Sequence, residues 1–556
     1  MLNANNIRQK YSPLPGILIV AIIGLALWLR VVGVQWGLPN ANHSNSYMPD
    51  ENNWISIMSR MEPSKLNLNP HNLSIPTFHF YLVGAGMQIA SFLNYVKIPS
   101  ERGHFFSLNH PDEYAKLFLI GRLFSVGMGV MTIWFMYLIG RDLYSRRVGI
   151  VASLFLTVIP SHIIHSHFFH VNVPVTFWIL LSFYFTTRIL RSRKIIWYLL
   201  TGITAGLGMS TKYTAFLLFI PLTVAHLLRE NGKYKAKDII ISLFSKRLCA
   251  GYLTILLLFV MGSPYIFLSW PDFVSGVSLL SHLGFESSSQ VIDWIKPITV
   301  IRYAAGLPLS IVSAMGLVLL IMRRDKSDIL ILTWVIPFYL VSVRIVYYVT
   351  DSRLVPLLPF LCLSAAVFLI QSIKFRLQRQ YLNYLRIAAV AILLVYNLLF
   401  SLSINSRFYG QDVQDNASDW ILENIPAGTN IGYETRPYWW APYIHYSPTD
   451  RSLLQKYPLI ICEWDKNILK KEKPPYFVAT DLTFHELPWG VNNWPQYEDF
   501  REYLRKNYRV VKVFNKEFRF GWFRTAIETR PDKGTILDIY YQPIYILKRL
   551  DEGDAV

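Results

Sequence analysis

Cysteine is scarce in this chain of 556 residues, which contains only Cys249, Cys362 and Cys462. Two of them fall in apolar segments and the third lies in the more polar C-terminal part. The three show neither a pairing pattern nor the spacing of metal ligands. The sequence therefore gives no support for a disulfide framework or for a zinc site made of cysteines.

Charge is also scarce, because charged residues make up 16% of the chain against 53% hydrophobic and 15% aromatic residues. With a mean hydropathy of +0.30, this composition is too apolar for an ordinary soluble protein. It predicts a membrane protein with many spans and a modest soluble part. The net charge of +18 does not indicate nucleic-acid binding, because the basic residues form short clusters between apolar segments, as the positive-inside bias predicts.

Internal repeats, heptads and low-complexity tracts are absent from the sequence. Transporters are often built from repeats with broken helices near the membrane midplane. The lack of a repeat therefore weighs against a transporter, although a lipid-linked sugar transporter stays an alternative.

The apolar segments predict about eleven membrane spans. Arg8 and Lys10 precede the first segment, which is longer than a signal-peptide core and is followed by no small-residue cleavage site, so we expect an uncleaved span. When the basic clusters between the apolar segments are placed in the cytoplasm, the connecting loops alternate consistently between the two sides of the membrane. The N-terminus is then cytoplasmic and the C-terminal segment extracytoplasmic. The expected spans are residues 14–34, 115–139, 148–168, 173–190, 196–210, 213–228, 249–268, 300–322, 328–348, 354–372 and 385–404.

The segment 76–94 tests this topology, because it is apolar enough to cross. If it crossed, Arg141, Arg146 and Arg147 would lie outside the cell, against the positive-inside bias. We therefore expect it to form a helix that lies at the outer surface or dips into it. The alternative is that this segment does cross the membrane, which changes the number of spans.

The domain organisation follows from this topology. We expect a transmembrane domain over residues 1–404, whose first outer loop runs from about residue 35 to 114. From residue 405 to 556 the chain has few long apolar runs and many Tyr, Trp, Pro and charged residues. Helix patterns at 415–424 and 497–506 alternate with strand patterns at 430–433, 476–479, 510–514 and 539–548, which predicts a small extracytoplasmic α/β domain.

Asp50 and Glu51 lie in the first outer loop, just beyond the first span. A carboxylate there suits a general base that removes a proton from an acceptor hydroxyl, or part of a metal site. The structural alternative is a pair at a helix N-terminus, with Asp50 capping a helix that starts at Glu51. The same Pro-Asp-Glu triplet recurs at 111–113 immediately before a span, where helix capping is favoured.

Further candidates reach the same outer face. Lys212, beside Tyr213, sits at a tip between two spans, where an ammonium can hold a phosphate or can snorkel to the headgroups. Arg353 can clamp a phosphate or pair with Asp351. His79 can contact a sugar or phosphate, although such a residue is more often interfacial.

Three other groups of residues are weaker signals. The histidines at 162, 165, 167 and 170 resemble a metal stripe, but no carboxylate accompanies them, so polar lining of a cavity is favoured over zinc. The loop with His282 and Glu286 could close over the site. The aromatic residues at 438–440 and 443 could form a carbohydrate platform, or else an ordinary core.

A series of short motifs in fixed order resembles a known family. The chain is similar to the bacterial branch of the GT-C glycosyltransferases related to dolichyl-phosphate-mannose protein mannosyltransferases and aminoarabinose transferases (glycosyltransferase family 39), over about residues 15–375. The motifs are Trp36-Gly37-Leu38-Pro39, Pro49-Asp50-Glu51, Phe78-His79-Phe80-Tyr81, Gly121-Arg122-Leu123, Ile139-Gly140-Arg141, Ser161-His162, Asn172-Val173-Pro174, Thr211-Lys212-Tyr213-Thr214-Ala215, Ser263-Pro264-Tyr265 and Arg353 before Pro356 and Pro359.

The resemblance implies a GT-C fold, a polyprenyl-phosphate sugar donor and transfer on the exoplasmic side. It implies Asp50 as the base, with Glu51 beside it, and Lys212 and Arg353 near the donor phosphate. Many relatives carry an aspartate where this chain has Asn172, so a requirement for a divalent cation is left open here.

The sequence thus predicts an inverting glycosyltransferase of the cell membrane that moves a sugar from a polyprenyl-phosphate donor to a hydroxyl of a protein, lipid or glycan. Asn172, Glu51, His79 and Tyr213 are expected near the acceptor or a metal. A non-catalytic subunit of a membrane complex, with a degenerate GT-C fold, is the other alternative.

Overall fold

The computed structural model describes most of the chain. The residues that it describes are 14–40, 43–98, 110–229, 236–281, 294–345, 350–371, 379–435, 441–442, 444, 457–480, 494–525 and 543–550. The loop residues His282 and Glu286 and the aromatic residues at 438–440 and 443 lie outside these ranges.

The chain divides into two compact units. The first consists of Met1–Val34, Arg60–Gly84 and Gly121–Leu402, and the second of Gln35–Ser59, Ala85–Ile120 and Ser403–Val556. The sequence boundary at residue 404 therefore falls close to one of these divisions. The compact second unit also takes in two stretches of the first loop, which the sequence had assigned to the transmembrane domain.

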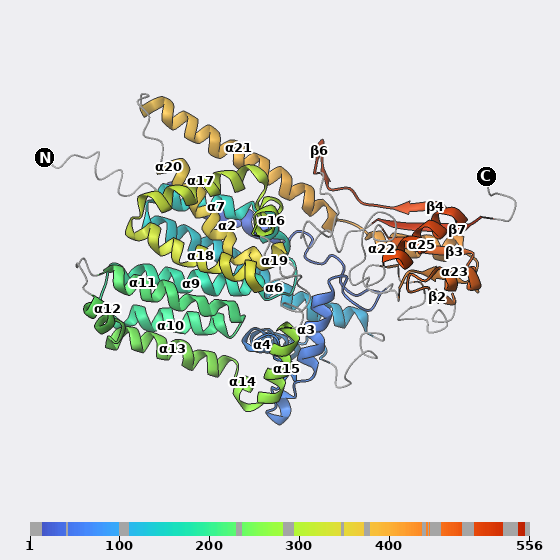
Figure 1. The fold of residues 1–556 in the computed structure, drawn as a ribbon, viewed down its shortest axis with the longest axis horizontal. Helices are drawn as coiled ribbons and strands as arrows, with labels where there is room; N and C mark the ends of the chain where they lie inside the picture. The colour runs from blue at the N-terminus through green and yellow to red at the C-terminus, as the bar shows by residue number, and fades with distance from the viewer. Residues whose placement is uncertain are drawn as a thin grey trace. The chain divides into compact units, whose positions relative to one another are not determined.

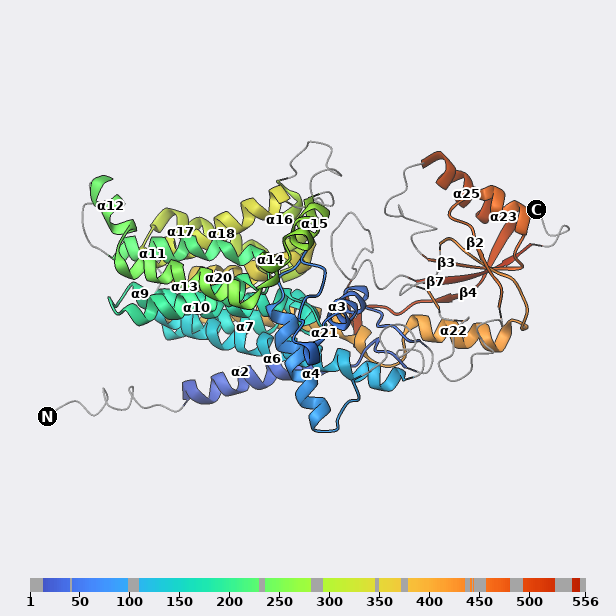
Figure 2. The same cartoon turned by 90° about the horizontal axis from the view of Figure 1, so that it is seen from below.

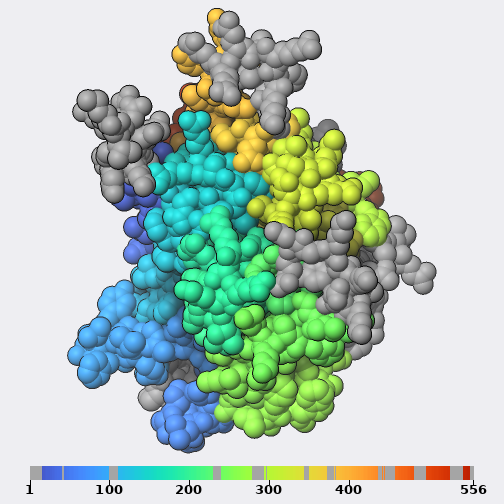
Figure 3. All heavy atoms as spheres, turned by 90° about the vertical axis from the view of Figure 1, so that its left-hand side faces the viewer, coloured from blue at the N-terminus to red at the C-terminus, as the bar shows by residue number. Residues whose placement is uncertain are grey.

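Helices cover each of the eleven predicted segments. Glycines allow some of them to approach closely: a Cβ on Gly206 of α10 would lie 2.6 Å from the Ile255 carbonyl oxygen of α13, so only glycine fits there. Figures 1 and 2 show α9, α10 and α13 side by side, and Figure 3 shows side chains of the cyan to yellow segments filling the end face of this unit. The helices are α2 (Leu14–Val31), α6 (Pro111–Leu143), α7 (Arg146–Thr157), α8 (Pro160–Ser166), α9 (Asn172–Ile189), α10 (Ile195–Met209), η2 (Tyr213–Leu218), α11 (Phe219–Arg229), α12 (Ala236–Leu243), α13 (Lys246–Gly262), α14 (Tyr265–Leu268), α15 (Trp270–Ser281), α16 (Lys296–Ala305), α17 (Leu307–Arg323), α18 (Lys326–Ile345), α19 (Asp351–Leu354), η4 (Val355–Leu357), α20 (Leu358–Gln371) and α21 (Arg379–Asn405).

Length and composition identify the strongest membrane spans. Within the described part of the chain, four helical runs are long and apolar enough to cross, and a fifth is added if α7 and α8, bent by 62° at their junction, count as one broken span. Other apolar helices of 10–17 residues accompany them. The four are Pro111–Leu143, Lys326–Val343, Asp351–Gln371 and Asn383–Asn424. In the last run the apolar helix ends at Asn405, and the residues from Val413 onward pack on the sheet of the C-terminal domain.

The segment 76–94 forms helix α4 (Phe78–Phe92), which has 15 residues. A perpendicular crossing needs about 20 residues, so α4 is short for a span. Its first turn is held by other helix ends, because the Phe78 backbone N–H donates to the Ser210 carbonyl at 3.0 Å, and Thr77 donates to the Gly262 carbonyl at 3.1 Å. Its placement at the outer surface stays a prediction.

The break between α7 and α8 is stabilised by Arg30 of α2. The last carbonyls of a helix have no partner within it, and here the Arg30 guanidinium donates to the carbonyls of Leu156 at 3.2 Å and Thr157 at 3.3 Å. It also donates to His162 Nδ1 at 3.0 Å. A buried arginine in an apolar segment is costly unless it is satisfied in this way, so Arg30 fixes the bend.

The second unit contains a five-stranded mixed sheet in the order β2-β1-β3-β7-β4. Strand β1 pairs in parallel with β2 and β3, whereas β7 pairs antiparallel with β3 and β4. The β4–β7 register shifts between Val510 and Lys512. The strands are β1 (Ile431–Tyr433), β2 (Leu459–Ile461), β3 (Tyr476–Thr480), β4 (Tyr508–Phe514) and β7 (Ile544–Arg549), and a separate hairpin contains β5 (Arg519–Phe520) and β6 (Phe523–Arg524).

Helices cover both faces of this sheet, as Figure 2 shows. Helix α22 (Val413–Asn424) packs on one face through Val413, Ala417 and Ile421, which share one side of the helix. Helices α23 (Lys466–Glu472) and α25 (Trp494–Asn507) pack on the other. The α/β class of this domain is therefore confirmed. Strand β2 was not among the predicted strands.

Candidate active site

Lys212 and Asn172 meet in the first unit. Lys212 Nζ donates to Asn172 Oδ1 at 2.5 Å, and Asn172 is 1% exposed. Asn172 is the first residue of α9, an 18-residue helix. An ammonium beside a helix N-terminus combines a full positive charge with backbone N–H groups that point outward, which is the electrostatics of an anion site.

Two histidines adjoin this pair. His170 Nδ1 accepts a hydrogen bond from the Asn172 backbone N–H at 3.3 Å. The ring of His79, from the first turn of α4, lies beside that of Phe169, the residue before His170, with centroids 5.8 Å apart. His79 is fully buried, and neither of its ring nitrogens has a hydrogen-bond partner among the residues the structure describes. The structure therefore brings His79, Asn172 and Lys212 into one polar cluster.

Tyr213 anchors the neighbouring loop rather than pointing to a ligand. Its hydroxyl donates to the Leu73 carbonyl at 2.8 Å, and its ring contacts Phe259 and Phe273 edge-on. The contact ties the segment before α4 to the 3-10 helix η2 that follows Lys212. Tyr213 thus supports the position of Lys212.

Asp351 and Arg353 lie on the short helix α19. Asp351 is buried and accepts hydrogen bonds from Ser161 and, at 3.1 Å, from His165 Nε2, both on α8. Arg353 is exposed on the same helix. Both alternatives for Arg353, a phosphate clamp and a partner of Asp351, stay open. Asp351 itself has a structural role, because it ties α19 to α8.

The histidine stripe is engaged within the protein fold. His162 accepts from Arg30, His165 contacts Asp351, and His167 donates to a backbone carbonyl, of Ile163 at 2.9 Å or Val32 at 2.7 Å. No group of three or more His, Cys, Asp or Glu residues in the described ranges is arranged to hold a metal ion. The four histidines are buried, and these contacts connect α8 to its neighbours.

Asp50 and Glu51 belong to the second unit, in the first turn of α3 (Pro49–Ser59). The helix prediction for this triplet is correct, but the helix begins at Pro49, one residue before Asp50. Glu51 is fully buried and accepts from Ser46 Oγ at 2.6 Å. Asp50 is half-buried, so it is the more accessible carboxylate of the two.

Two aspartates at the start of α22 hold the loop that precedes Asp50. Trp36 Nε1 donates to Asp412 Oδ1 at 2.5 Å, and the Tyr47 hydroxyl donates to Asp415 Oδ1 at 2.5 Å. The His43 ring stacks on Tyr47 with centroids 4.0 Å apart. The C-terminal domain therefore clamps the loop 36–47, which leads directly into the helix that carries Asp50.

Asp412 makes this clamp sensitive to pH. Burial, and then the neighbouring Asp415 carboxylate, raise the pKa of Asp412 to about 7. The folded state therefore binds this proton more tightly than the unfolded state. The contribution of the protonated Asp412 to the stability of the fold is complete below about pH 4 and is lost as the pH rises through about 7. We expect Asp412→Asn, which keeps an acceptor for Trp36, to flatten this dependence.

At pH 8 the free energy of unfolding of the Asp412→Asn variant should exceed that of the wild type by at most about 4 kcal/mol. Urea denaturation of the full chain in micelles between pH 4 and 8 measures it, with Asp419→Asn on the same helix as the control. Parallel pH profiles for Asp412→Asn and the wild type would contradict the assignment.

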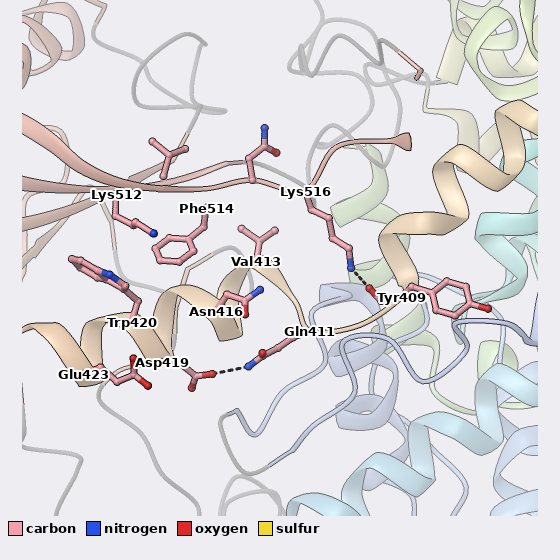
Figure 4. A pocket seen from close by; sticks show the side chains of 12 residues that line it. Tyr409, Gln411, Val413, Asn416, Asp419, Trp420, Glu423, Lys512, Phe514 and Lys516 are labelled. Atoms are coloured by element: carbon pink, nitrogen blue, oxygen red, sulfur yellow. Dashed lines mark hydrogen bonds between the residues drawn. The ribbon is translucent and has the colours of Figure 1, made fainter. Parts of the chain in front are cut away.

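A groove of about 710 Å³ lies between α22 and β4 (Figure 4). Trp420 and Phe514 meet edge-on in it, with ring centroids 6.3 Å apart. The Gln411 side chain donates to Asp419 at 2.6 Å along one wall, and Lys512 and other exposed polar side chains complete the lining. None of the predicted site residues lines this groove.

Arg30 is a buried charged residue that the sequence reasoning missed, and its contacts are structural. The signal was present, because a lone arginine inside an apolar segment marks a site that needs a partner. His170 was assigned only to general cavity lining. Its hydrogen bond from the Asn172 backbone N–H is local, because the two residues lie two positions apart in the turn between α8 and α9.

Part of the chain matches a known protein family. Residues 117–268, which include Asn172 and Lys212, match the family model of dolichyl-phosphate-mannose-protein mannosyltransferases. No curated protein sequence matches the chain in direct comparison.

Solved structures extend the comparison to nearly the whole chain. The apo oligosaccharyltransferase of Archaeoglobus fulgidus is 12% identical, covers 94% of this chain and 76% of its own, and gives a TM-score of 0.50. ArnT from Cupriavidus metallidurans bound to undecaprenyl phosphate is 12% identical, with 96% and 98% covered and a TM-score of 0.48. The chain has the GT-C glycosyltransferase fold, with apolar membrane helices and a C-terminal sheet-containing domain, so the fold implied by the sequence resemblance is confirmed.

Proposed function

We propose that this protein is an inverting glycosyltransferase that moves a sugar from a polyprenyl-phosphate donor to a hydroxyl group at the exoplasmic face of the cell membrane. The acceptor is a protein, lipid or glycan. The family that matches residues 117–268 and the solved structures of similar fold are glycosyltransferases. The ArnT structure is described as bound to undecaprenyl phosphate, which is a lipid phosphate of the kind that carries the sugar in the donor class proposed here.

The observation that carries the proposal is the contact between Lys212 Nζ and Asn172 Oδ1 at the N-terminus of α9. In this mechanism the donor phosphate binds there, and Arg353 contributes a second positive charge. Because these charges are fixed before reaction, they stabilise the negative charge that develops on the leaving phosphate.

Asp50 acts as the general base. The acceptor oxygen attacks the anomeric carbon while its proton passes to the Asp50 carboxylate, and the bond from that carbon to the phosphate oxygen breaks with its electron pair. One displacement inverts the anomeric carbon, so no covalent enzyme intermediate forms. Glu51 positions this loop through Ser46. His79 is the proposed contact to the sugar or the phosphate, because neither of its ring nitrogens has a hydrogen-bond partner among the described residues.

The direct test is sugar release from a panel of polyprenyl-phosphate sugars by purified full-length protein, with native membrane extract as the acceptor source. We expect turnover of one donor and inversion of the anomeric carbon. Binding of polyprenyl phosphate without its sugar is measured in parallel by fluorescence titration. Folded protein that neither binds the lipid phosphate nor turns over any donor would contradict the proposal and favour a non-catalytic subunit.

A further inference from the structure

An exposed aromatic hairpin projects from the second unit. Strands β5 and β6 pair antiparallel, with Phe520 opposite Phe523. Gly521, with φ +57°, and Trp522 form the two-residue turn, which requires a left-handed residue. Trp522 is 83% exposed and Phe520 is 45% exposed. An isolated two-stranded hairpin is marginal in water, so further contacts must hold it.

Those contacts tie the base of the hairpin to the end of α21. Thr525 Oγ1 and Ser403 Oγ are 2.7 Å apart, and the Arg519 backbone N–H donates to Ser406 Oγ at 3.4 Å. The Arg407 guanidinium stacks on the Phe518 ring, 4.4 Å from its centroid. The hairpin is therefore fixed to the residues that follow the last apolar helix.

That helix is a membrane-span candidate by length and composition. Its surface carries exposed aliphatic side chains suited to lipid, such as Leu385, Ile387, Ile392 and Val395. The hairpin base begins where this apolar surface ends. An apolar span ends where the hydrocarbon core meets water, and the residues that hold the hairpin base directly follow the apolar part of α21 along the chain.

The hairpin has the chemistry of that boundary. Trp and Tyr gather at membrane interfaces, because an aromatic ring with one polar group suits the headgroup layer. Arg519 and Arg524 flank the aromatic tip, and Arg524 also forms an ion pair with Glu517 at 3.0 Å. Cationic side chains at this depth are attracted to anionic headgroups.

We propose that the hairpin Arg519–Arg524 is a membrane-surface anchor, whose Trp522 and Phe520 side chains insert among the headgroups of the leaflet at the C-terminal end of α21. Arg519 and Arg524 contact anionic lipid phosphates there. The anchor attaches the C-terminal domain to the bilayer at a second point besides α21. This inference does not depend on the proposed transferase activity.

A nitroxide at position 522 tests the proposal. Trp522→Cys is labelled in a Cys249→Ser background, because Cys249 is exposed whereas Cys362 and Cys462 are buried. The full chain is placed in nanodiscs of phosphatidylcholine with phosphatidylglycerol, and collision with oxygen is compared with collision with a water-soluble nickel chelate. Val510→Cys, on a strand of the same unit and 47% exposed, is the matched control.

We expect a several-fold higher ratio of oxygen to nickel accessibility at position 522 than at position 510. Equal ratios would overturn the proposal, because the tip would then lie in water. Low accessibility to both reagents would also overturn it, because a protein surface would then cover the tip.

The unmodified tryptophan provides a second measurement. Brominated lipids should quench more fluorescence in the wild type than in Trp522→Phe, and the difference spectrum reports Trp522 alone among the sixteen tryptophans. An absent difference would contradict insertion, whatever the labelled variant shows.

Discussion

Replacing Asp50 with asparagine is expected to abolish sugar transfer and to leave donor binding unchanged. Asparagine keeps the size of the side chain and its place in the first turn of α3, but it cannot accept a proton from the attacking hydroxyl. General-base catalysis contributes about 10²–10⁴-fold, so kcat should fall by about that factor. Single-turnover transfer from the donor identified in the panel measures the loss.

The chain supplies its own matched control. Asp112 follows Pro111 in the first turn of α6, as Asp50 follows Pro49 in α3. Asp112→Asn should therefore leave turnover at the wild-type rate. Full activity of Asp50→Asn, or an equal loss in both variants, would remove Asp50 from the mechanism.

Replacing Lys212 with methionine should give the second large effect. Methionine keeps an unbranched side chain but removes the positive charge beside the N-terminus of α9. Loss of one group that stabilises developing charge typically costs about 10²–10³ in rate. We expect kcat/KM for the donor to fall by about that factor, with weaker binding of polyprenyl phosphate and partial recovery in Lys212→Arg.

Because Lys212 also holds buried Asn172, the folding of each variant is checked by circular dichroism and thermal unfolding. Lys65→Met, at a lysine whose side chain is 71% exposed, is the control for loss of one positive charge. A folded Lys212→Met protein with unchanged kcat/KM would show that the ammonium has no role at the phosphate.

Much of the fold was predictable because its signals are local. Spans depend on the apolar length needed to cross a bilayer. The predicted segments fall on helices, although among the described residues only four helical runs, or five with the bent pair α7 and α8, are long and apolar enough to cross. Both Pro-Asp-Glu triplets lie at helix starts, as suggested, although each helix begins at the proline and not after the aspartate. The α/β domain followed from short alternating helix and strand patterns.

The candidate site was predictable only in part. The sequence marked Lys212, Asn172 and His79 separately, because polar side chains stand out among apolar segments. It did not show that Lys212 contacts Asn172 or that Asp351 is held by Ser161 and His165. Those contacts depend on helix packing between distant segments.

The sequence by itself therefore determined the class of this protein: apolar membrane helices, a C-terminal α/β domain and charged residues at the ends of spans. Each follows from hydropathy and periodicity, which act over short stretches of chain. Only the tertiary structure decided that Arg30 caps the broken helix α7 and that Asp412 and Asp415 clamp the loop before Asp50. A buried polar group must find a partner somewhere in the fold, but the sequence does not specify where.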